Sequence, residues 1–311
     1  MIAAFTLNVS IDRRYVVQNS AMNKVNRVQE CVYTAGGKGL NVARVIHALG
    51  EPVIAGGIAG GDAGRYILRR LDEEGIAHQF TQVQGESRSC INICDTVTGT
   101  QTEYLEPGSP VSEEEQERFL QDYDELLAKC SVLTISGSMP KGMPADTYAR
   151  LIERARKAGK PVLLDTSGAA LTASVASGPY YIKPNEDEIG TLTDCGVDNE
   201  QLLAEAALKL HKGSIDRVVV SMGSRGALMA CSEGVFRGQP PAIKAVNTVG
   251  CGDSMTAAFA VAALRGLNAE ESLRLAIGVS CASALNPGTG GFCQADYDAV
   301  APGVQVWRVE L

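Results

Sequence analysis

Thr248-Val249-Gly250-Cys251-Gly252-Asp253-Ser254-Met255 stands immediately before an apolar stretch that is typical of a helix. Glycines at a strand-to-helix junction leave backbone N–H groups free in the first helical turn, where the helix dipole adds partial positive charge. Such a turn can hold an anion such as a phosphate. Asp253 would repel that anion, so its position suits a base beside a phosphate under attack. The alternative is that Asp253 and Ser254 only cap the helix.

A second glycine-rich stretch lies near the N-terminus and reads Ala35-Gly36-Gly37-Lys38-Gly39-Leu40-Asn41-Val42-Ala43-Arg44. Its glycines allow a ligand to approach the backbone closely. Apolar residues then recur with helical spacing as far as Leu49, so the ligand would meet the beginning of a helix.

The rest of the chain alternates short apolar runs with amphipathic helical patterns. We expect strands at 2–8, 52–58, 132–136, 161–165 and 217–221, and helices at 38–49, 62–74, 113–128 and 146–158. This alternation predicts an α/β fold with a mostly parallel sheet and helices on both faces, which makes three layers.

Two regions, 13–34 and 88–106, interrupt this rhythm with β-like alternation and no helix between the runs. Ser89–Cys94 and Thr100–Leu105 are typical of a hairpin. We expect these insertions to form a small β-sheet that projects from the main domain. The sequence otherwise predicts one domain over residues 1–311, since it shows no repeat and no low-complexity linker.

Composition excludes several classes of function. The chain has 311 residues, 45% of them hydrophobic, and a net charge of −8, which argues against binding nucleic acid or a membrane surface. Its apolar runs are too short to span a bilayer, and the N-terminus lacks the basic region of a signal peptide. Nine scattered cysteines without a Cys-x-x-Cys pair fit the reducing cytoplasm.

Two common nucleotide-binding motifs are missing. A P-loop requires Lys followed by Ser or Thr, but Lys38 is followed by Gly39. A dinucleotide fold requires Gly-x-Gly after the first strand, where this chain has Asn8-Val9-Ser10.

Polar residues follow other expected strands. Asp12 comes shortly after the first strand, where a carboxylate can accept hydrogen bonds from neighbouring sugar hydroxyls; the alternative is an ordinary turn aspartate. Lys183-Pro184-Asn185-Glu186-Asp187-Glu188 lies where a strand is expected to give way to a helix. Its oxygen ligands would suit Mg²⁺ and phosphate, and the alternative is an acidic capping turn.

The two glycine-rich stretches, in this order, resemble the signatures of the PfkB-type carbohydrate kinases of the ribokinase-like superfamily, and the resemblance extends from Thr6 to about Gly290. It implies a ribokinase-like fold in which the projecting sheet is a lid. The pattern is most similar to tagatose-6-phosphate kinases and 1-phosphofructokinases.

The resemblance assigns roles to individual residues. Asp253 would be the catalytic base, and N–H groups of Gly250, Cys251 and Gly252 would stabilise the phosphoryl group. The sugar phosphate would be bound by Asp12, Gly36, Gly37, Lys38, Asn41, Arg88, Ser138 and Arg27, with Lys38 and Arg88 on its phosphate and Lys141 a weaker candidate. The nucleotide would be bound by Lys183, Asn185, Ser221, Gly223 and Gly226, and Mg²⁺ by Asn185 and Glu188.

These roles imply ATP-dependent phosphorylation of a ketohexose monophosphate to a 1,6-bisphosphate. Mg²⁺ and ATP would be required, a monovalent cation such as K⁺ is a further candidate, and a homodimer through the lid sheets is expected. The alternatives are a kinase of another sugar or nucleoside, and a non-catalytic sugar-phosphate sensor.

Two residues depart from the family pattern: Val9 replaces a usual proline, and Cys251 replaces alanine or serine, which predicts an acidic thiol.

Overall fold

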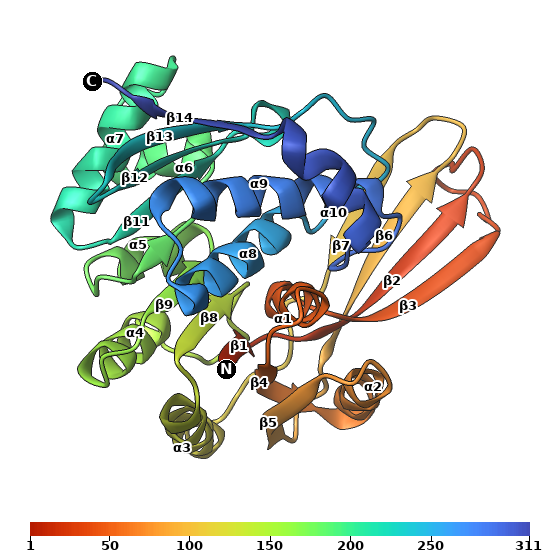
Figure 1. Ribbon diagram of the computed structural model, residues 1–311. Helices are drawn as coiled ribbons and strands as arrows, with labels where there is room; N and C mark the ends of the chain where they lie inside the picture. Colours follow the sequence, from red (N-terminus) through yellow and green to blue (C-terminus); the bar gives the residue numbers. More distant parts are fainter.

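The computed structural model describes residues 1–311 and divides the strands between two sheets (Figure 1). The larger sheet has ten strands in the order β14-β13-β12-β11-β10-β9-β8-β1-β4-β5. Its parallel part comprises β1 (Ile2–Thr6), β4 (Val53–Gly60), β5 (Ala77–Val83), β8 (Val132–Ser136), β9 (Val162–Asp165), β10 (Tyr181–Ile182) and β11 (Arg217–Ser221). The antiparallel strands β12 (Ala227–Cys231), β13 (Gly234–Gln239) and β14 (Gln305–Val309) extend one edge.

Helices cover both faces of this sheet, which confirms the predicted fold class. One face carries α1 (Lys38–Ala48), α2 (Gly61–Glu73), α8 (Cys251–Arg265), α9 (Ala269–Leu285) and α10 (Gln294–Val300). The other carries α3 (Glu113–Lys129), α4 (Thr147–Lys157), α5 (Gly168–Val175), α6 (Glu186–Thr193) and α7 (Glu200–Gly213). No helix combines the length and apolar character needed to cross a bilayer.

The hydrophobic core has two parts because side chains on a strand point alternately to the two faces. Ile2 and Ala4 of β1 contribute to one part, whereas Ala3 and Phe5 contribute to the other. Strands buried on both faces lack polar alternation, which explains their continuous apolar runs.

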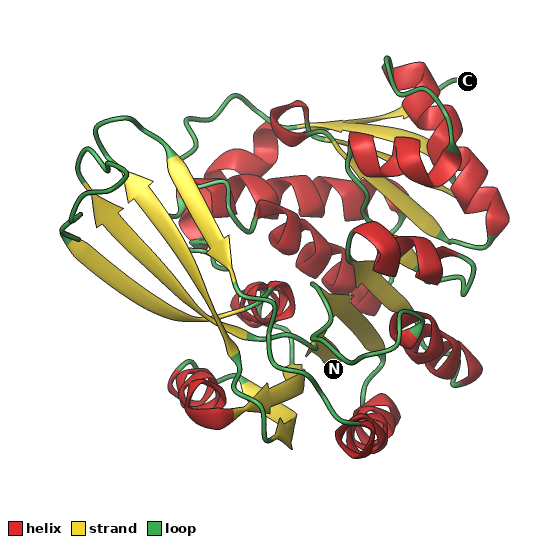
Figure 2. Ribbon diagram, turned by 180° about the vertical axis from the view of Figure 1, so that it is seen from behind, coloured by secondary structure: helices red, strands yellow, loops and turns green.

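The small sheet has the order β3-β2-β6-β7 and stands off the body of the protein (Figure 2). It consists of β2 (Ser10–Val17), β3 (Glu30–Gly36), β6 (Arg88–Asp95) and β7 (Gln101–Leu105). The predicted hairpin is confirmed as β6 and β7, which pair antiparallel, and β2 joins it in parallel to β6. Its first insertion begins earlier than expected, at Ser10, and residues 18–29 form no strand.

Candidate active site

The first turn of α8 presents Asp253 at the edge of the sheet where the parallel strands end. Gly250 precedes the helix at φ +87°, in the left-handed region that favours glycine. The Asp253 side chain is buried, and its carboxylate accepts a hydrogen bond of 2.8 Å from Asn41 Nδ2 of α1. The two glycine-rich stretches of the sequence therefore meet at this contact.

Backbone donors lie beside the Asp253 carboxylate. The N–H groups of Gly250 and Gly252 have no acceptor in the structure, whereas that of Cys251 donates to the Thr248 carbonyl oxygen at 3.3 Å. A Cβ atom added to Gly252 would lie 3.1 Å from Lys183 Nζ. The helix N-terminus and this ammonium group therefore point to an anion site, with two free N–H groups instead of the three expected.

Asp165, at the end of β9, is a site residue that our sequence analysis missed. Its Oδ1 lies 3.5 Å from both Lys38 Nζ and Lys183 Nζ, and its Oδ2 accepts a hydrogen bond of 3.1 Å from Thr256 Oγ1 of α8. Its side chain is only 3% exposed. The signal was available, because an acid that ends an apolar strand meets the criterion that identified Asp12.

The environments of Asp165 and Asp253 give them different proton affinities. Burial raises the pKa of Asp253 to about 6, and the Asp165 carboxylate adds to this, while Lys38 and the Asn41 hydrogen bond oppose it. Burial also acts on Asp165, but the ammonium groups of Lys183 and Lys38 outweigh it and hold the pKa below its usual range. The Asp165 carboxylate thus has a lowered pKa and the Asp253 carboxylate titrates near neutrality, a pattern typical of acid–base sites.

Lys38 reaches Asp165 because α1 begins very close to β1. A Cβ atom on Gly39 would overlap Thr6 Oγ1 and the Phe5 carbonyl group, so only glycine allows this approach. Asp165 raises the pKa of Lys38, which keeps the ammonium group charged. Lys38 therefore lies with Asp165 and Asp253, not among the residues around Asp12.

Asp12 and Arg88 form a second polar group, where the small sheet leaves the body. Asp12 Oδ1 accepts a hydrogen bond of 2.6 Å from Ser10 Oγ, and a side chain on Gly36 of the paired strand would overlap the Asp12 carboxylate. Burial raises the pKa of Asp12, and Ser10 and Arg88 oppose this. Arg88 Nε donates to the Asn8 carbonyl oxygen at 3.2 Å.

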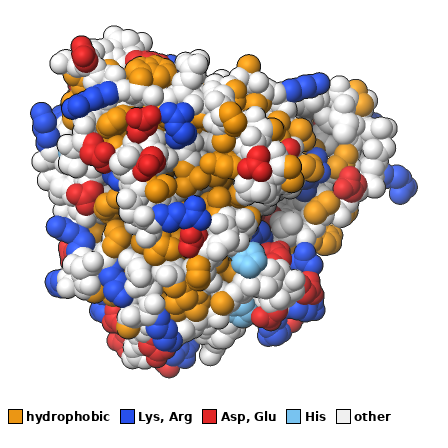
Figure 3. All heavy atoms as spheres, in the orientation of Figure 1, with side chains coloured by type: hydrophobic (Ala, Val, Ile, Leu, Met, Phe, Trp, Pro, Cys, Tyr) orange, Lys and Arg blue, Asp and Glu red, His pale blue; other side chains and the backbone are white.

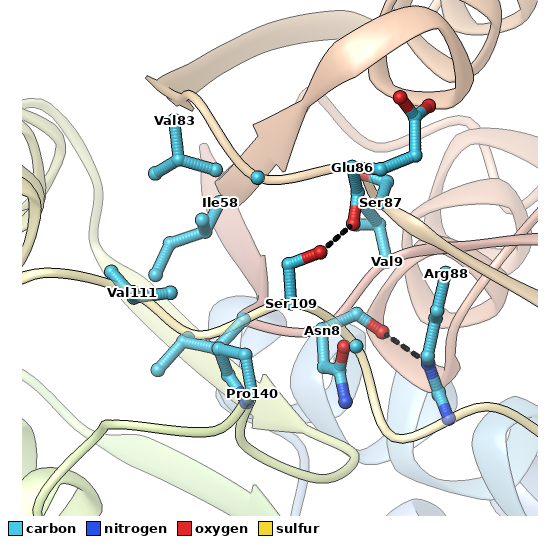
Figure 4. A pocket seen from close by; sticks show the side chains of 13 residues that line it. Asn8, Val9, Ile58, Val83, Glu86, Ser87, Arg88, Ser109, Val111 and Pro140 are labelled. Carbon is cyan, nitrogen blue, oxygen red and sulfur yellow. Dashed lines mark hydrogen bonds between the residues drawn. The ribbon is translucent and has the colours of Figure 1, made fainter.

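A small cavity lies at this junction, with Asn8 and Arg88 on its rim (Figure 4). Its volume is about 20 Å³, enough for one water molecule. Asn8 Nδ2 donates to Ser138 Oγ at 3.2 Å, which brings the expected residue Ser138 to the same junction. The cavity does not include Asp253, so it lies at the junction of the two sheets and apart from the predicted base.

The expected nucleotide-binding residues lie on neighbouring segments. Asn185 and Glu188 form a capping box at the start of α6, in which each side chain binds the backbone N–H of the other. Ser221 pairs with Asn185 in a β-bridge, and Gly223 and Gly226 follow it at positive φ. The capping interpretation is therefore correct, but it leaves one Glu188 oxygen free, and this donor set fits a Mg²⁺ ion that takes few protein ligands.

The structure does not support the expected roles of two other residues, Arg27 and Cys251. Arg27 is exposed in the segment between β2 and β3, and its side chain makes no hydrogen bond or ion pair within this chain. The predicted acidic thiol at Cys251 is wrong, because burial, together with the nearby Asp253, raises its pKa to about 11. Proximity to a helix N-terminus does not compensate for loss of water.

Comparisons with known proteins identify the family of the chain and similar folds. The sequence profile of the pfkB family carbohydrate kinases matches residues 5–295. Escherichia coli phosphofructokinase-2, solved in complex with substrates and products, is 29% identical over 97% of this chain and 98% of its own, with a TM-score of 0.90. A possible 1-phosphofructokinase from Thermotoga maritima is 25% identical over 100% of both chains, also with a TM-score of 0.90. Arabidopsis thaliana ribokinase, solved with ribose and ATP, shares the fold at 21% identity, covering 96% of this chain and 97% of its own, with a TM-score of 0.78.

Proposed function

Because the chain belongs to the pfkB family of carbohydrate kinases, we propose that it phosphorylates a ketohexose monophosphate with ATP, giving a 1,6-bisphosphate and ADP. The observation that carries the proposal is the buried Asp253 carboxylate, with a pKa of about 6, at the N-terminus of α8. A group that titrates near the working pH is well suited to act as a general base.

Each part of the site has a role in this reaction. Asp253 orients the attacking hydroxyl and accepts its proton, while Asn41 holds the carboxylate in place. The free N–H groups of Gly250 and Gly252 stabilise negative charge on the transferring phosphoryl group. Arg88 binds the phosphate already on the sugar, since its guanidinium fork suits phosphate oxygens, and Asp12 accepts hydrogen bonds from sugar hydroxyls.

Asn185 and Glu188 would hold a Mg²⁺ ion together with the nucleotide phosphates, and the ion would neutralise their charge. Lys183, Ser221, Gly223 and Gly226 would bind the nucleotide. Escherichia coli phosphofructokinase-2 has been solved in complex with potassium, which supports testing K⁺ as a second cofactor. The nine free thiols are consistent with the proposed cytoplasmic location.

The site residues do not determine which primary hydroxyl of the sugar is phosphorylated. A furanose ketohexose has primary hydroxyls at both ends, so one pocket can accept either orientation of a phosphate ester. The names of the phosphofructokinase relatives support fructose 6-phosphate or fructose 1-phosphate, and tagatose 6-phosphate stays a candidate from the sequence pattern.

A coupled assay of ADP release tests the proposal. Mg-ATP is supplied with fructose 1-phosphate, fructose 6-phosphate, tagatose 6-phosphate and free fructose, with and without KCl. We expect kcat/KM to be highest for one phosphate ester. The Asp253→Asn variant should lose about 10²–10⁴-fold in kcat and retain sugar-phosphate binding, because it removes the base and keeps the shape. Tight sugar-phosphate binding without turnover by the wild type would instead identify a sensor.

We also propose that the protein forms a homodimer through the small sheet. The strand register places Asp12 on one face of this sheet and Tyr33, Ile91 and Tyr104 on the opposite face. Tyr33 and Tyr104 are 45% and 56% exposed. The space-filling view shows apolar side chains on this projecting part (Figure 3). An apolar sheet face that is open to solvent is typical of an interface.

A further inference from the structure

Asp165 joins two parts of the site that the sequence keeps far apart. Lys38 comes from the start of α1 and Lys183 from the segment after β10, yet both ammonium nitrogens lie 3.5 Å from the same carboxylate oxygen. The second carboxylate oxygen accepts the hydrogen bond from Thr256 of α8. Asp165 is therefore held by the same helix that carries Asp253.

We propose that Asp165 is a positioning residue that keeps the Lys38 and Lys183 ammonium groups together beside Asp253, so that both contact the phosphoryl group during transfer. The proposal rests on the proposed kinase function and changes one assignment within it. Lys38 contacts the phosphoryl group that is transferred, and Arg88 alone binds the phosphate already on the sugar.

The distances support a shared anion between the two lysines. Since each nitrogen is 3.5 Å from one oxygen, the two nitrogens are at most twice that distance apart. Charge-assisted N–H···O contacts are about 2.7–2.9 Å long, so one phosphoryl group can bridge such a span. Two ammonium groups this close repel each other unless an anion lies between them. Asp165 supplies that anion before the phosphate arrives.

Arg88 and Lys38 lie near different carboxylates, which indicates that they bind different phosphate groups. Arg88 and Arg44 are the cations that act on Asp12 at the sugar end. Lys38 acts on Asp165 and Asp253 instead. Its side chain is 47% exposed, whereas that of Lys183 is 9% exposed. Lys38 is thus the more accessible of the two lysines.

The Lys38→Met variant tests the assignment, because Asp165 keeps Lys183 as a partner and the fold is preserved. We expect kcat to fall about 10²-fold, as for other lost transition-state contacts. ATP binding should weaken about tenfold and ADP binding less than twofold, since only ATP has the phosphoryl group to be transferred. The Kd of the sugar phosphate, measured by calorimetry, should change less than twofold.

Two further variants calibrate this result. Arg88→Met should weaken sugar-phosphate binding by tenfold or more and leave the ratio of ATP to ADP affinity unchanged. Lys129→Met removes an exposed lysine at the end of α3, outside the site, and should match the wild type in all these measurements. A Lys38→Met variant that behaves like Arg88→Met would overturn the proposal.

A double-mutant cycle separates positioning from general structural support. Asp165→Asn should lower kcat, and adding Lys38→Met should lower it less than twofold further, because the lysine is already misplaced. The acid limb of the pH profile should also move to lower pH, since a neighbouring negative charge is lost. Losses that multiply, with no movement of the acid limb, would show that Asp165 only supports the fold.

The outcomes distinguish this inference from the proposed function. If the wild type phosphorylates none of the sugars, the kinase proposal fails, and the comparison of ATP with ADP in Lys38→Met still decides the role of Lys38. Equal weakening of both nucleotides would overturn that role even in an active kinase.

Discussion

At the residue scale, two buried carboxylates in one site behave differently because their neighbours differ. Asp165 has two ammonium groups within 3.5 Å, whereas Asp253 has a neutral amide at 2.8 Å. The first stays ionised and fixes cations, and the second can exchange a proton. The same residue type thus supplies a permanent charge at one position and a base at the other.

This difference predicts the pH dependence of the reaction. The pKa of Asp253 is raised to about 6, so Asp253 is protonated below that pH and cannot accept the hydroxyl proton. We expect kcat/KM to fall about tenfold per pH unit below about pH 6. Initial rates should be measured from pH 5 to 8, with circular dichroism at each pH as a control for unfolding. A flat profile in a folded protein would exclude Asp253 as the base.

At the element scale, the antiparallel pairing of β2 with β3 shapes the sugar end of the site. Asp12 lies on β2, and the last residue of β3, Gly36, provides the space for its carboxylate. Neither strand alone would hold Asp12 in place. The position of this side chain is therefore a property of the strand pair.

Gly36→Ala is expected to displace Asp12, because the added methyl group overlaps its carboxylate. Overpacking of this kind costs about 1–3 kcal/mol in the free energy of unfolding. The KM for the sugar phosphate should rise at least tenfold, with a smaller change in the KM for ATP. Gly213→Ala, at an open position of α7, is the matched control and should leave both KM values unchanged. Equal changes in the two variants would argue against a specific role for Gly36.

The sequence predicts some elements well and others not at all. The patterns for β8 and β11 give their observed bounds, because each is a short apolar run between turn signals. No prediction was made for β12, β13 or β14, although β12 and β13 form a hairpin around Ser232 and Glu233. β12 and β13 follow a glycine-containing segment that the resemblance had already assigned to nucleotide binding, and β14 lies much later, after α10.

The candidate site residues also include some that the sequence predicts and some that it does not. Asn41 and Asp253 were each named from a motif, Asn41 as a sugar ligand, and their hydrogen bond was not predicted. The contact of Asp165 with Lys38 and Lys183 depends on β9 lying between β8 and β10. Strand order is set by long-range packing, so single-sequence patterns do not show it.

At the scale of the whole molecule, the open face of the small sheet predicts the oligomeric state. Sedimentation velocity should show a dimer, and Tyr33→Glu with Tyr104→Glu should shift it to a monomer, since two charges oppose burial of the face. Trp307→Glu, which charges an exposed aromatic position on β14, should stay dimeric. A wild-type monomer would refute the proposal. A tetramer that survives both tyrosine changes would point to another interface, and Escherichia coli phosphofructokinase-2 has been solved as a tetrameric inhibited form.

The position of β1 has a consequence for how the protein is made. The first strand of the chain lies inside the ten-stranded sheet, between β4 and β8, and packs under α8, which is among the last elements to be synthesised. At roughly 5–20 residues per second, ribosomal synthesis leaves this face of β1 with α1 but without α8 for on the order of ten seconds or more. Nascent chains should therefore depend on chaperones during this interval. A chain that terminates before α8 would lack a helix that packs on the core and would lack Asp253, the proposed base. Premature termination therefore yields no partly active fragment.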